Sequence, residues 1–98
     1  MDTYEIVDGV RRAKAADLAG HDTIWAVVDG DAHEQKVPVH TLLSPKRVID
    51  ITTPRELKRW RNVVEGMREE PDLLPPIVIR PGSNGIPIRD VPVVGGPP

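Results

Sequence analysis

The chain has 98 residues, which is enough for one small domain and too few for two. Apolar residues make up 39% of it and only 3% are aromatic, so the core must rest on valine, isoleucine and leucine. A net charge of −2 with 29% charged residues excludes charge-driven disorder and a general nucleic-acid coat protein. The lack of cysteine excludes disulfides, thiolate metal sites and a sulfur nucleophile.

Membrane and targeting segments are not expected. No uncharged run approaches the ~18 apolar residues of a membrane span, and no positively charged start leads into an apolar signal segment. We therefore expect a soluble protein with a single domain over residues 1–94. Residues 95–98 are all glycine or proline and are expected to form a flexible tail.

The first third of the chain predicts a strand, a helix and a second strand. Residues 3–7 are β-formers that end at the turn signal Asp8-Gly9. Residues 10–19 are rich in alanine and meet Gly20, where a left-handed cap costs least, so they predict a short helix. Residues 23–28 form an uncharged run without alternation, which is typical of an inner strand covered on both faces.

The second helix has the clearest signal. Thr53 suits the N-cap, Pro54 suits the first helical position, and Glu56 follows three residues after Thr53. Its buried face is marked by apolar residues at helical spacing, namely Leu57, Trp60, Val64 and Met67. Pro71 is expected to end the helix. The exposed face is expected to carry Lys58, Arg59, Arg61, Glu65, Arg68 and Glu69. The spacing of Trp60 favours the core over stacking on a nucleic-acid base.

Three shorter segments complete the predicted sheet. Residues 37–43 alternate as a strand does, and Pro38 places that strand at a sheet edge. Residues 76–79 predict a short apolar strand, and residues 86–94 predict a last edge strand whose prolines forbid full pairing. The order strand, helix, strand, strand, helix, strand, strand predicts an α+β fold, with two helices on one face of a small mixed β-sheet.

The junction of the first strand and first helix holds the strongest candidate for a site. Arg11 and Arg12 lie in the first helical turn, where each cation costs ~0.3–1 kcal/mol because the helix dipole is positive there. The free N–H groups of residues 10–12 and the guanidinium groups can hold a phosphate, and Gly9 lets the backbone come close. The alternative is that Asp8 or other acidic neighbours neutralise the arginines and the turn binds nothing.

Two segments resemble a known family. Residues 4–28, YEIVDGVRRAKAADLAGHDTIWAVV, resemble the second half of the ParB N-terminal domain. That half has a strand, a glycine-glutamate-arginine-arginine box, an alanine-rich helix, leucine-alanine-glycine and a threonine-isoleucine strand. Residues 37–81, with VPV, a helix and LPPIVIRP, resemble the first half, so the resemblance covers about 70 residues.

The two halves stand in the opposite order from the family, which implies a circular permutation of the ParB/sulfiredoxin-like fold. In that fold the arginine box and the loop after the Val-Pro-Val strand line one nucleotide or phosphate cleft. The resemblance therefore implies a phosphate-binding set of Gly9, Val10, Arg11, Arg12, Ser44, Lys46 and Arg47. Without the resemblance, Lys46 and Arg47 are an exposed turn pair.

Departures from the family pattern narrow the implied chemistry. Val10 replaces the box glutamate that helps ParB hold its metal, and it also stands where sulfiredoxin has its catalytic cysteine. Neither the ParB clamp nor the sulfiredoxin reaction is therefore expected. The form Asp-Gly-x-x-Arg is closer to ParB-like kinases and nuclease-like members. The kinase-type relatives have a glutamate where this chain has Lys46-Arg47, which disfavours a kinase.

Three side chains are candidates for catalysis. Asp8 is expected to orient a water or to hold Mg²⁺, and Arg12 is expected to stabilise charge on phosphate oxygens. His40, on the strand that leads to the loop of residues 44–47, is a candidate general base. The alternatives are a turn or helix-capping role for Asp8 and a solvated position at the edge of the core for His40.

The leading hypothesis is an enzyme, a nuclease or nucleoside-triphosphate hydrolase, that acts on the phosphates of nucleic acid or of a nucleotide. The resemblance also implies a toxin domain delivered from a secreted bacterial protein into the bacterial cytoplasm, with an immunity protein as its partner. The alternative is a non-catalytic module that binds the same phosphates, which the loss of the box glutamate favours. A purely structural adaptor is the third hypothesis.

Overall fold

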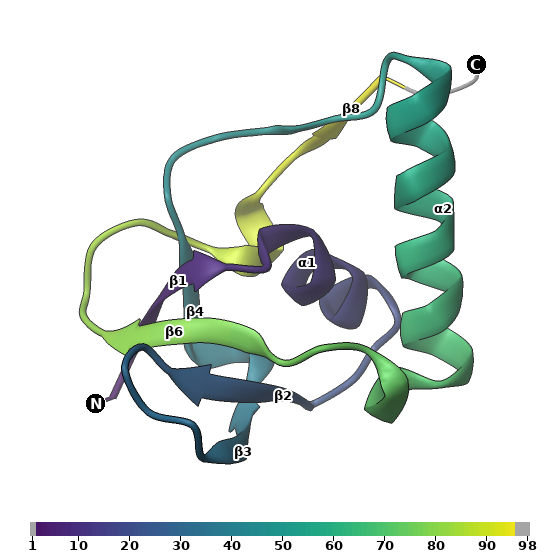
Figure 1. Cartoon of the computed structure of the whole chain (residues 1–98). Coiled ribbons are helices and arrows are strands. Elements are labelled where there is room, and N and C mark those ends of the chain that lie inside the picture. Colours follow the sequence, from purple (N-terminus) through teal and green to yellow (C-terminus); the bar gives the residue numbers. More distant parts are fainter. Residues whose placement is uncertain (1, 96–98) are drawn as a thin grey trace.

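The computed structural model describes residues 2–95 and has the α+β fold that the sequence predicts (Figure 1). Six strands form a mixed sheet in the order β3-β2-β6-β1-β4-β7, and β5 and β8 form a separate pair. The strands are β1 (Tyr4–Asp8), β2 (Thr23–Val28), β3 (Glu34–Pro38), β4 (Leu42–Ser44), β5 (Ile49–Asp50), β6 (Ile77–Pro81), β7 (Ile86–Pro87) and β8 (Val93–Val94). The helices are α1 (Val10–Leu18) and α2 (Pro54–Glu69), and short 3-10 turns span Val39–Thr41, Pro71–Leu73 and Ile88–Asp90.

The strand pairing brings both halves of the chain into one sheet. Strand β1 is parallel to β4 on one side and antiparallel to β6 on the other. Strand β6 is in turn parallel to β2, so β2 is an inner strand, as predicted, and β3 is the edge. Ile24 and Ala26 of β2 are buried, whereas Trp25 is half-buried and donates its indole N–H to Asp72 over 2.8 Å. The expectation that both faces of β2 are covered is therefore corrected.

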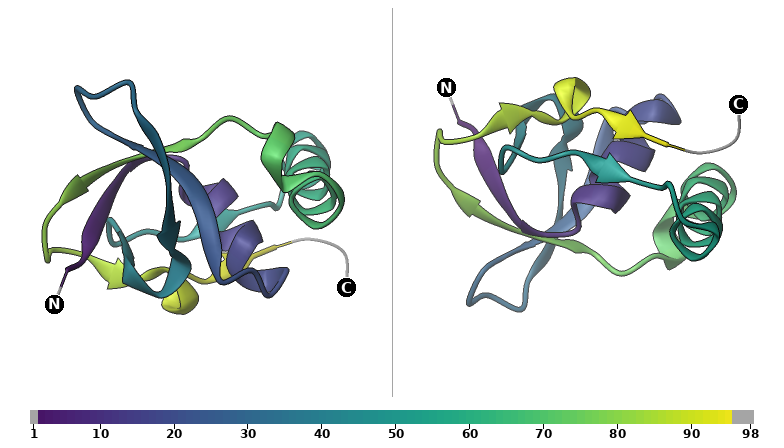
Figure 2. Two further views of the ribbon diagram at one scale, coloured as in Figure 1. Left: turned by 90° about the horizontal axis from the view of Figure 1, so that it is seen from below. Right: turned by 90° about the horizontal axis from the view of Figure 1, so that it is seen from above.

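Helix α1 lies at the centre of the molecule, between the sheet and α2 (Figures 1 and 2). Its buried residues are Val10, Ala13, Lys14, Ala15 and Ala16. Alanine side chains are small, so the neighbouring elements approach the helix closely. The prediction of a helix here is confirmed, and Gly20 follows its end with the expected positive φ, 80°.

Helix α2 begins as the sequence predicts. The Thr53 hydroxyl accepts a hydrogen bond from the Glu56 amide over 3.2 Å, and Pro54 is the first helical residue. Trp60 and Met67 are buried, so the expectation that Trp60 belongs to the core is confirmed. The main packing partner of α2 is α1, and only its C-terminal turn leads back to the sheet through Pro71–Leu73. The predicted charged face is exposed: Lys58, Arg59, Arg61, Glu65, Arg68 and Glu69.

Two predicted strands are corrected. Residues 37–43 are not one strand, because a 3-10 turn at Val39–Thr41 separates β3 from β4. Strand β3 pairs with β2 and retains Pro38 at the sheet edge, while β4 crosses to pair with β1. Residues 86–94 are likewise divided into β7, a 3-10 turn and β8, because Pro87 and Pro92 cannot donate to a ladder.

The core consists of isoleucine, valine and leucine with a few alanines, as the composition requires. Its largest fully buried apolar residues are Leu42, Ile49, Ile77, Ile79, Ile88 and Val91. Of the predicted tail, residues 96–98 lie outside the described part of the chain. Within residues 2–95 neither helix combines the length and the apolar character that crossing a membrane demands.

Candidate functional site

The junction of β1 and α1 is built on Gly9. This residue has φ 107°, a left-handed conformation that L side chains rarely adopt. An added Cβ would lie 2.6 Å from Cγ2 of Ile77 and 3.1 Å from the Nη2 atom of Arg12. Glycine is therefore required both by the backbone and by the space. The guanidinium of Arg12 lies over Gly9, at the N-terminal end of α1.

Arg12 is held between two oxygen atoms. Its Nη2 donates to Oδ2 of Asp8 over 3.2 Å, and its Nη1 donates to the Pro75 carbonyl over 3.1 Å. The arginine side chain is only 18% exposed, whereas Asp8 is 74% exposed. These bonds use two of the five N–H donors of the guanidinium. Arg12 thus joins β1, α1 and the segment before β6. Its pair with Asp8 is the one expected by the alternative hypothesis, in which acidic neighbours neutralise the arginines.

The start of α1 lacks a side-chain cap. The earliest amides of any helix have no acceptor within the helix, which here concerns residues 10–12. No side chain caps the helix at Gly9, and its first turn contains no acidic residue. Asp8 therefore does not cap α1, and its role as a helix cap is corrected. The Ala13 amide is the first to bond within the helix, to Gly9 over 2.9 Å.

Arg11 points to α2 rather than to the Arg12 side. Its Nη2 lies 2.5 Å from Oε2 of Glu56, and the other oxygen of that carboxylate accepts from Arg59 over 3.3 Å. Sequence reasoning placed Glu56 in a helix cap and missed this role, because a pair 45 residues apart leaves no local signal. Arg11 therefore contributes its backbone to the junction while its side chain bridges the two helices.

The loop after β4 lies at the same sheet edge as Gly9, because β4 and β1 are parallel and both end there. Ser44 is fully buried, and its hydroxyl donates to the Pro45 carbonyl over 2.8 Å. This corrects the expectation that Ser44 binds phosphate. Lys46 and Arg47 are exposed. Within residues 2–95 neither of them forms an ion pair with an acidic side chain, and their part in the phosphate-binding set stays a prediction.

His40 lies at the opposite end of α1. It is exposed on the 3-10 turn after β3 and lines a pocket of about 520 Å³ together with Asp17, His21 and Arg89. Helix α1 is ~13 Å long at 1.5 Å per residue, and its whole length separates this pocket from Asp8. The structure therefore does not bring together the predicted catalytic set of Asp8, Arg12 and His40, and the proposed base is corrected.

Lys14 is a buried charged residue that the sequence analysis did not predict. It is 6% exposed, and its ammonium donates to the carbonyls of Arg89 over 2.9 Å and Ile88 over 3.3 Å. Asp17 lies 3.8 Å away on the same helix. The residue anchors α1 to the turn before β8. A single lysine in an alanine-rich helix gives no sequence signal for such a role.

Asp8 is the one predicted metal contact. A single exposed carboxylate would hold Mg²⁺ only together with the phosphate oxygens of a ligand, which is how this ion is commonly bound. Within the described residues 2–95, no group of three or more histidine, aspartate or glutamate side chains is placed to hold a metal ion.

No family model, curated protein or solved structure matches this chain. The resemblance to the ParB N-terminal domain rests on residues 4–28 and 37–81 alone and stays a prediction.

Proposed function

We propose that this domain binds phosphate groups of a nucleotide or a nucleic acid at the junction of β1 and α1. The observation that carries the proposal is the Arg12 guanidinium lying over Gly9, at the end of α1 where the first amides lack helical acceptors. An anion there meets backbone donors, a positive helix end and a fixed guanidinium. Arg12 is already immobilised by Asp8 and Pro75, so binding does not have to order it.

Asp8 regulates how strongly the junction attracts an anion. Its carboxylate faces the same guanidinium as an incoming phosphate and is largely open to solvent. It opposes a bare anion, whereas a phosphate that arrives with Mg²⁺ turns the same carboxylate into a ligand. We therefore expect Mg²⁺ to favour binding by the wild-type chain.

Replacing Arg12 tests the binding function. Arg12→Gln removes one guanidinium from the junction, and we expect the affinity for ATP with Mg²⁺ to fall about 10- to 100-fold, the value of a charged hydrogen bond. The matched control is Arg89→Gln, which removes the same charge from an arginine that is 77% exposed at the other end of α1. Isothermal titration calorimetry measures both, with circular dichroism to verify folding. Equal affinities for the two variants would contradict the proposal.

Replacing Asp8 gives a second test of binding that does not depend on how Arg12→Gln folds. Asp8→Asn removes the competing charge, so we expect it to bind inorganic phosphate more tightly than wild type without Mg²⁺. Unchanged or weaker phosphate binding would contradict the proposed role of Arg12 and Asp8.

Hydrolysis is the second candidate, favoured by the exposed carboxylate beside a guanidinium. In that case wild type releases product from a nucleic acid or a nucleoside triphosphate, and Asp8→Asn abolishes release with the fold intact. Chromatographic analysis of products distinguishes the two functions. A chain that binds but releases nothing is a binding module.

A further inference from the structure

The charges of the chain are divided unevenly. Residues 46–61 contain six of the 13 basic residues: Lys46, Arg47, Arg55, Lys58, Arg59 and Arg61. They contain only two acidic residues, Asp50 and Glu56, so this segment carries a net charge of +4 while the rest of the chain carries −6. We call this segment, from Lys46 to Arg61, the basic segment. The net charge of the whole chain, −2, does not reveal this positive segment.

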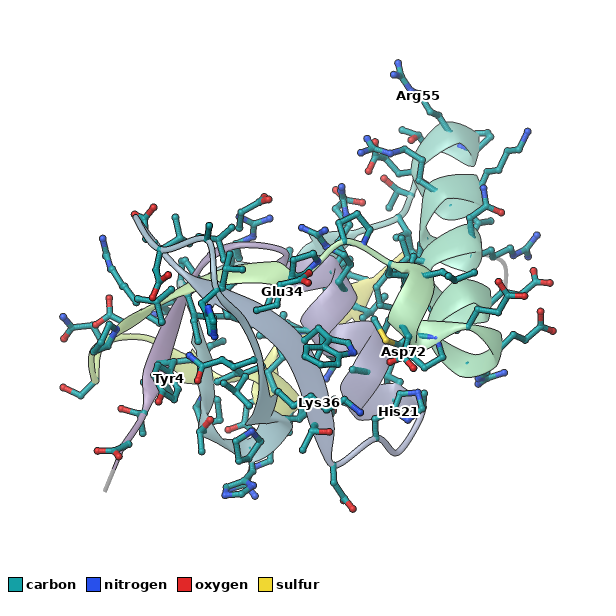
Figure 3. The ribbon with its side chains drawn as sticks, turned by 60° about the horizontal axis from the view of Figure 1, so that its bottom comes forward. Tyr4, His21, Glu34, Lys36, Arg55 and Asp72 are labelled. Atoms are coloured by element: carbon teal, nitrogen blue, oxygen red, sulfur yellow. The ribbon has the colours of Figure 1, made fainter. Side chains whose placement is uncertain are left out.

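The basic segment follows the chain from the end of β4 onto α2. It starts in the loop after β4, beside the end of β1, and runs in extended form through β5 to the start of α2 (Figures 1 and 2). On α2, residues three and four apart share a face, which makes Arg55 a neighbour of Lys58 and Arg59. All six basic side chains belong to exposed residues, and Arg55 projects from the outer end of the helix (Figure 3).

The basic segment is continuous with the proposed phosphate site. Glu56 accepts from Arg11 of the β1–α1 junction and from Arg59 of the exposed helix face. This carboxylate therefore fixes one cation on each side and joins the two surfaces. Within residues 2–95, no acidic side chain forms an ion pair with Arg55, Lys58 or Arg61.

The first half of α2 carries most of the positive charge of this helix. Arg55 lies in the first turn, where the helix dipole is positive, and Glu56 in the same turn pairs with Arg59. Residues 54–61 carry a net charge of +3, whereas residues 62–69, with Glu65, Arg68 and Glu69, carry −1, so an anion is favoured along the first half. From Arg55 to Arg61 the helix rises ~9 Å, which is more than a single phosphate group spans.

We propose that the basic segment tracks the phosphate backbone of a nucleic-acid strand, one phosphate of which occupies the β1–α1 junction. This inference rests on the proposed phosphate site and names its ligand as a polymer rather than a free nucleotide. Phosphates of one strand recur every ~3.4 Å along a duplex axis and somewhat farther apart in an extended strand, so several can contact the segment at once. Such contacts release counterions and make binding depend on salt.

Two triple variants test this inference. Arg55→Gln, Lys58→Gln and Arg61→Gln together remove three cations from the basic segment without touching the junction. The matched control, Lys36→Gln, Arg68→Gln and Arg89→Gln, removes the same charge from exposed positions elsewhere. The probes are a fluorescein-labelled oligodeoxythymidine of about 20 nucleotides, followed by fluorescence anisotropy, and ATP with Mg²⁺, followed by calorimetry.

We expect the basic-segment variant to lose at least about tenfold in oligonucleotide affinity and about 2 units of the salt slope, at ~0.7 for each lost phosphate contact. ATP binding by the same variant should stay unchanged, and the control should bind both probes like wild type. The inference is overturned if the basic-segment variant retains the oligonucleotide affinity, or if the control loses as much. It is also overturned if poly-L-glutamate competes as well as nucleic acid at equal charge, which would indicate an acidic protein partner.

The failures of the two proposals differ. If Arg12→Gln weakens ATP binding while the basic-segment variant changes nothing, the junction binds phosphate and only the strand-tracking inference fails. If the oligonucleotide binds through the basic segment but Arg12→Gln has no effect on either probe, the proposed phosphate site fails, and with it the placement of a phosphate at the junction.

Discussion

At the scale of single residues, Gly9 determines whether the β1–α1 junction can form. Its φ of 107° and the 2.6 Å that would separate an added Cβ from Ile77 exclude a side chain for two independent reasons. At Gly20, at the other end of α1, only the backbone disfavours a side chain. Its φ is 80°, but no neighbouring atom lies within 4 Å of the position of an added Cβ.

We expect Gly9→Ala to lower the free energy of unfolding by ~2–4 kcal/mol, which combines backbone strain with overpacking. Gly20→Ala should cost only the strain, ~1–2 kcal/mol. Urea denaturation followed by circular dichroism measures both. Equal losses for the two variants would contradict the contact between Gly9 and Ile77.

Glu5 links β1 to the turn after β6. Its carboxylate accepts from the Asn84 amide over 3.1 Å and from Arg80, the residue opposite it in the sheet, over 3.1 and 3.2 Å. A Cβ on Gly82 would overlap this carboxylate, so the turn is shaped around it. The Asn84 amide and then Arg80 outweigh partial desolvation and hold the pKa of Glu5 below its ordinary value of 4.5.

A lowered folded-state pKa stabilises the fold when the carboxylate is charged in both states. The contribution of Glu5 is therefore complete above pH 4.5 and is lost as the pH falls through the folded-state pKa. We expect Glu5→Gln to be less stable than wild type at neutral pH, with a difference that shrinks as the solution is acidified below pH 4.5. Thermal unfolding across pH measures this, with Glu69→Gln as the exposed control. A difference that grows in acid would contradict the assigned contacts.

At the scale of elements, the parts predicted from sequence are those with local signals. The cap at Thr53 and the turn at Gly9 act within a few residues, so both helices begin where the sequence indicates. Residues 37–43 are divided between two strands because β4 pairs with β1, more than 30 residues earlier in the chain. No local sequence pattern predicts that pairing. The burial of Ser44 was not predicted for the same reason: it depends on the pairing of β4, which places Ser44 on the buried face of that strand with Leu42.

The attachment of α1 to the last 3-10 turn depends on Lys14. Lys14→Met keeps the apolar stem but leaves the carbonyls of Ile88 and Arg89 without their donor. We expect a loss of ~1–3 kcal/mol in the free energy of unfolding, the cost of buried acceptors that lose a partner. Lys58→Met on the exposed face of α2 should change stability by less than ~0.5 kcal/mol. A Lys14→Met protein as stable as wild type would show that burying the ammonium costs as much as its hydrogen bonds contribute.

At the scale of the whole molecule, the proposed binding sites depend on where charged residues lie rather than on the net charge of the chain. The junction and the basic segment are separate in sequence, and the parallel pairing of β1 with β4 and the Arg11–Glu56 pair bring them together. The candidate residues at the junction were predictable because Gly9 and Arg12 act through local geometry. The exclusion of His40 was not, since it depends on which end of α1 the turn after β3 reaches.

A phosphate site at the start of α1 can be observed directly in a two-dimensional ¹H–¹⁵N NMR titration of the chain with inorganic phosphate at constant ionic strength. We expect the largest saturable shifts at the backbone amides of Val10, Arg11 and Arg12, and we expect Arg12→Gln to remove the saturation. Shifts that never saturate, or saturable shifts confined to α2 or to the pocket beside His40, would contradict a phosphate site at the start of α1.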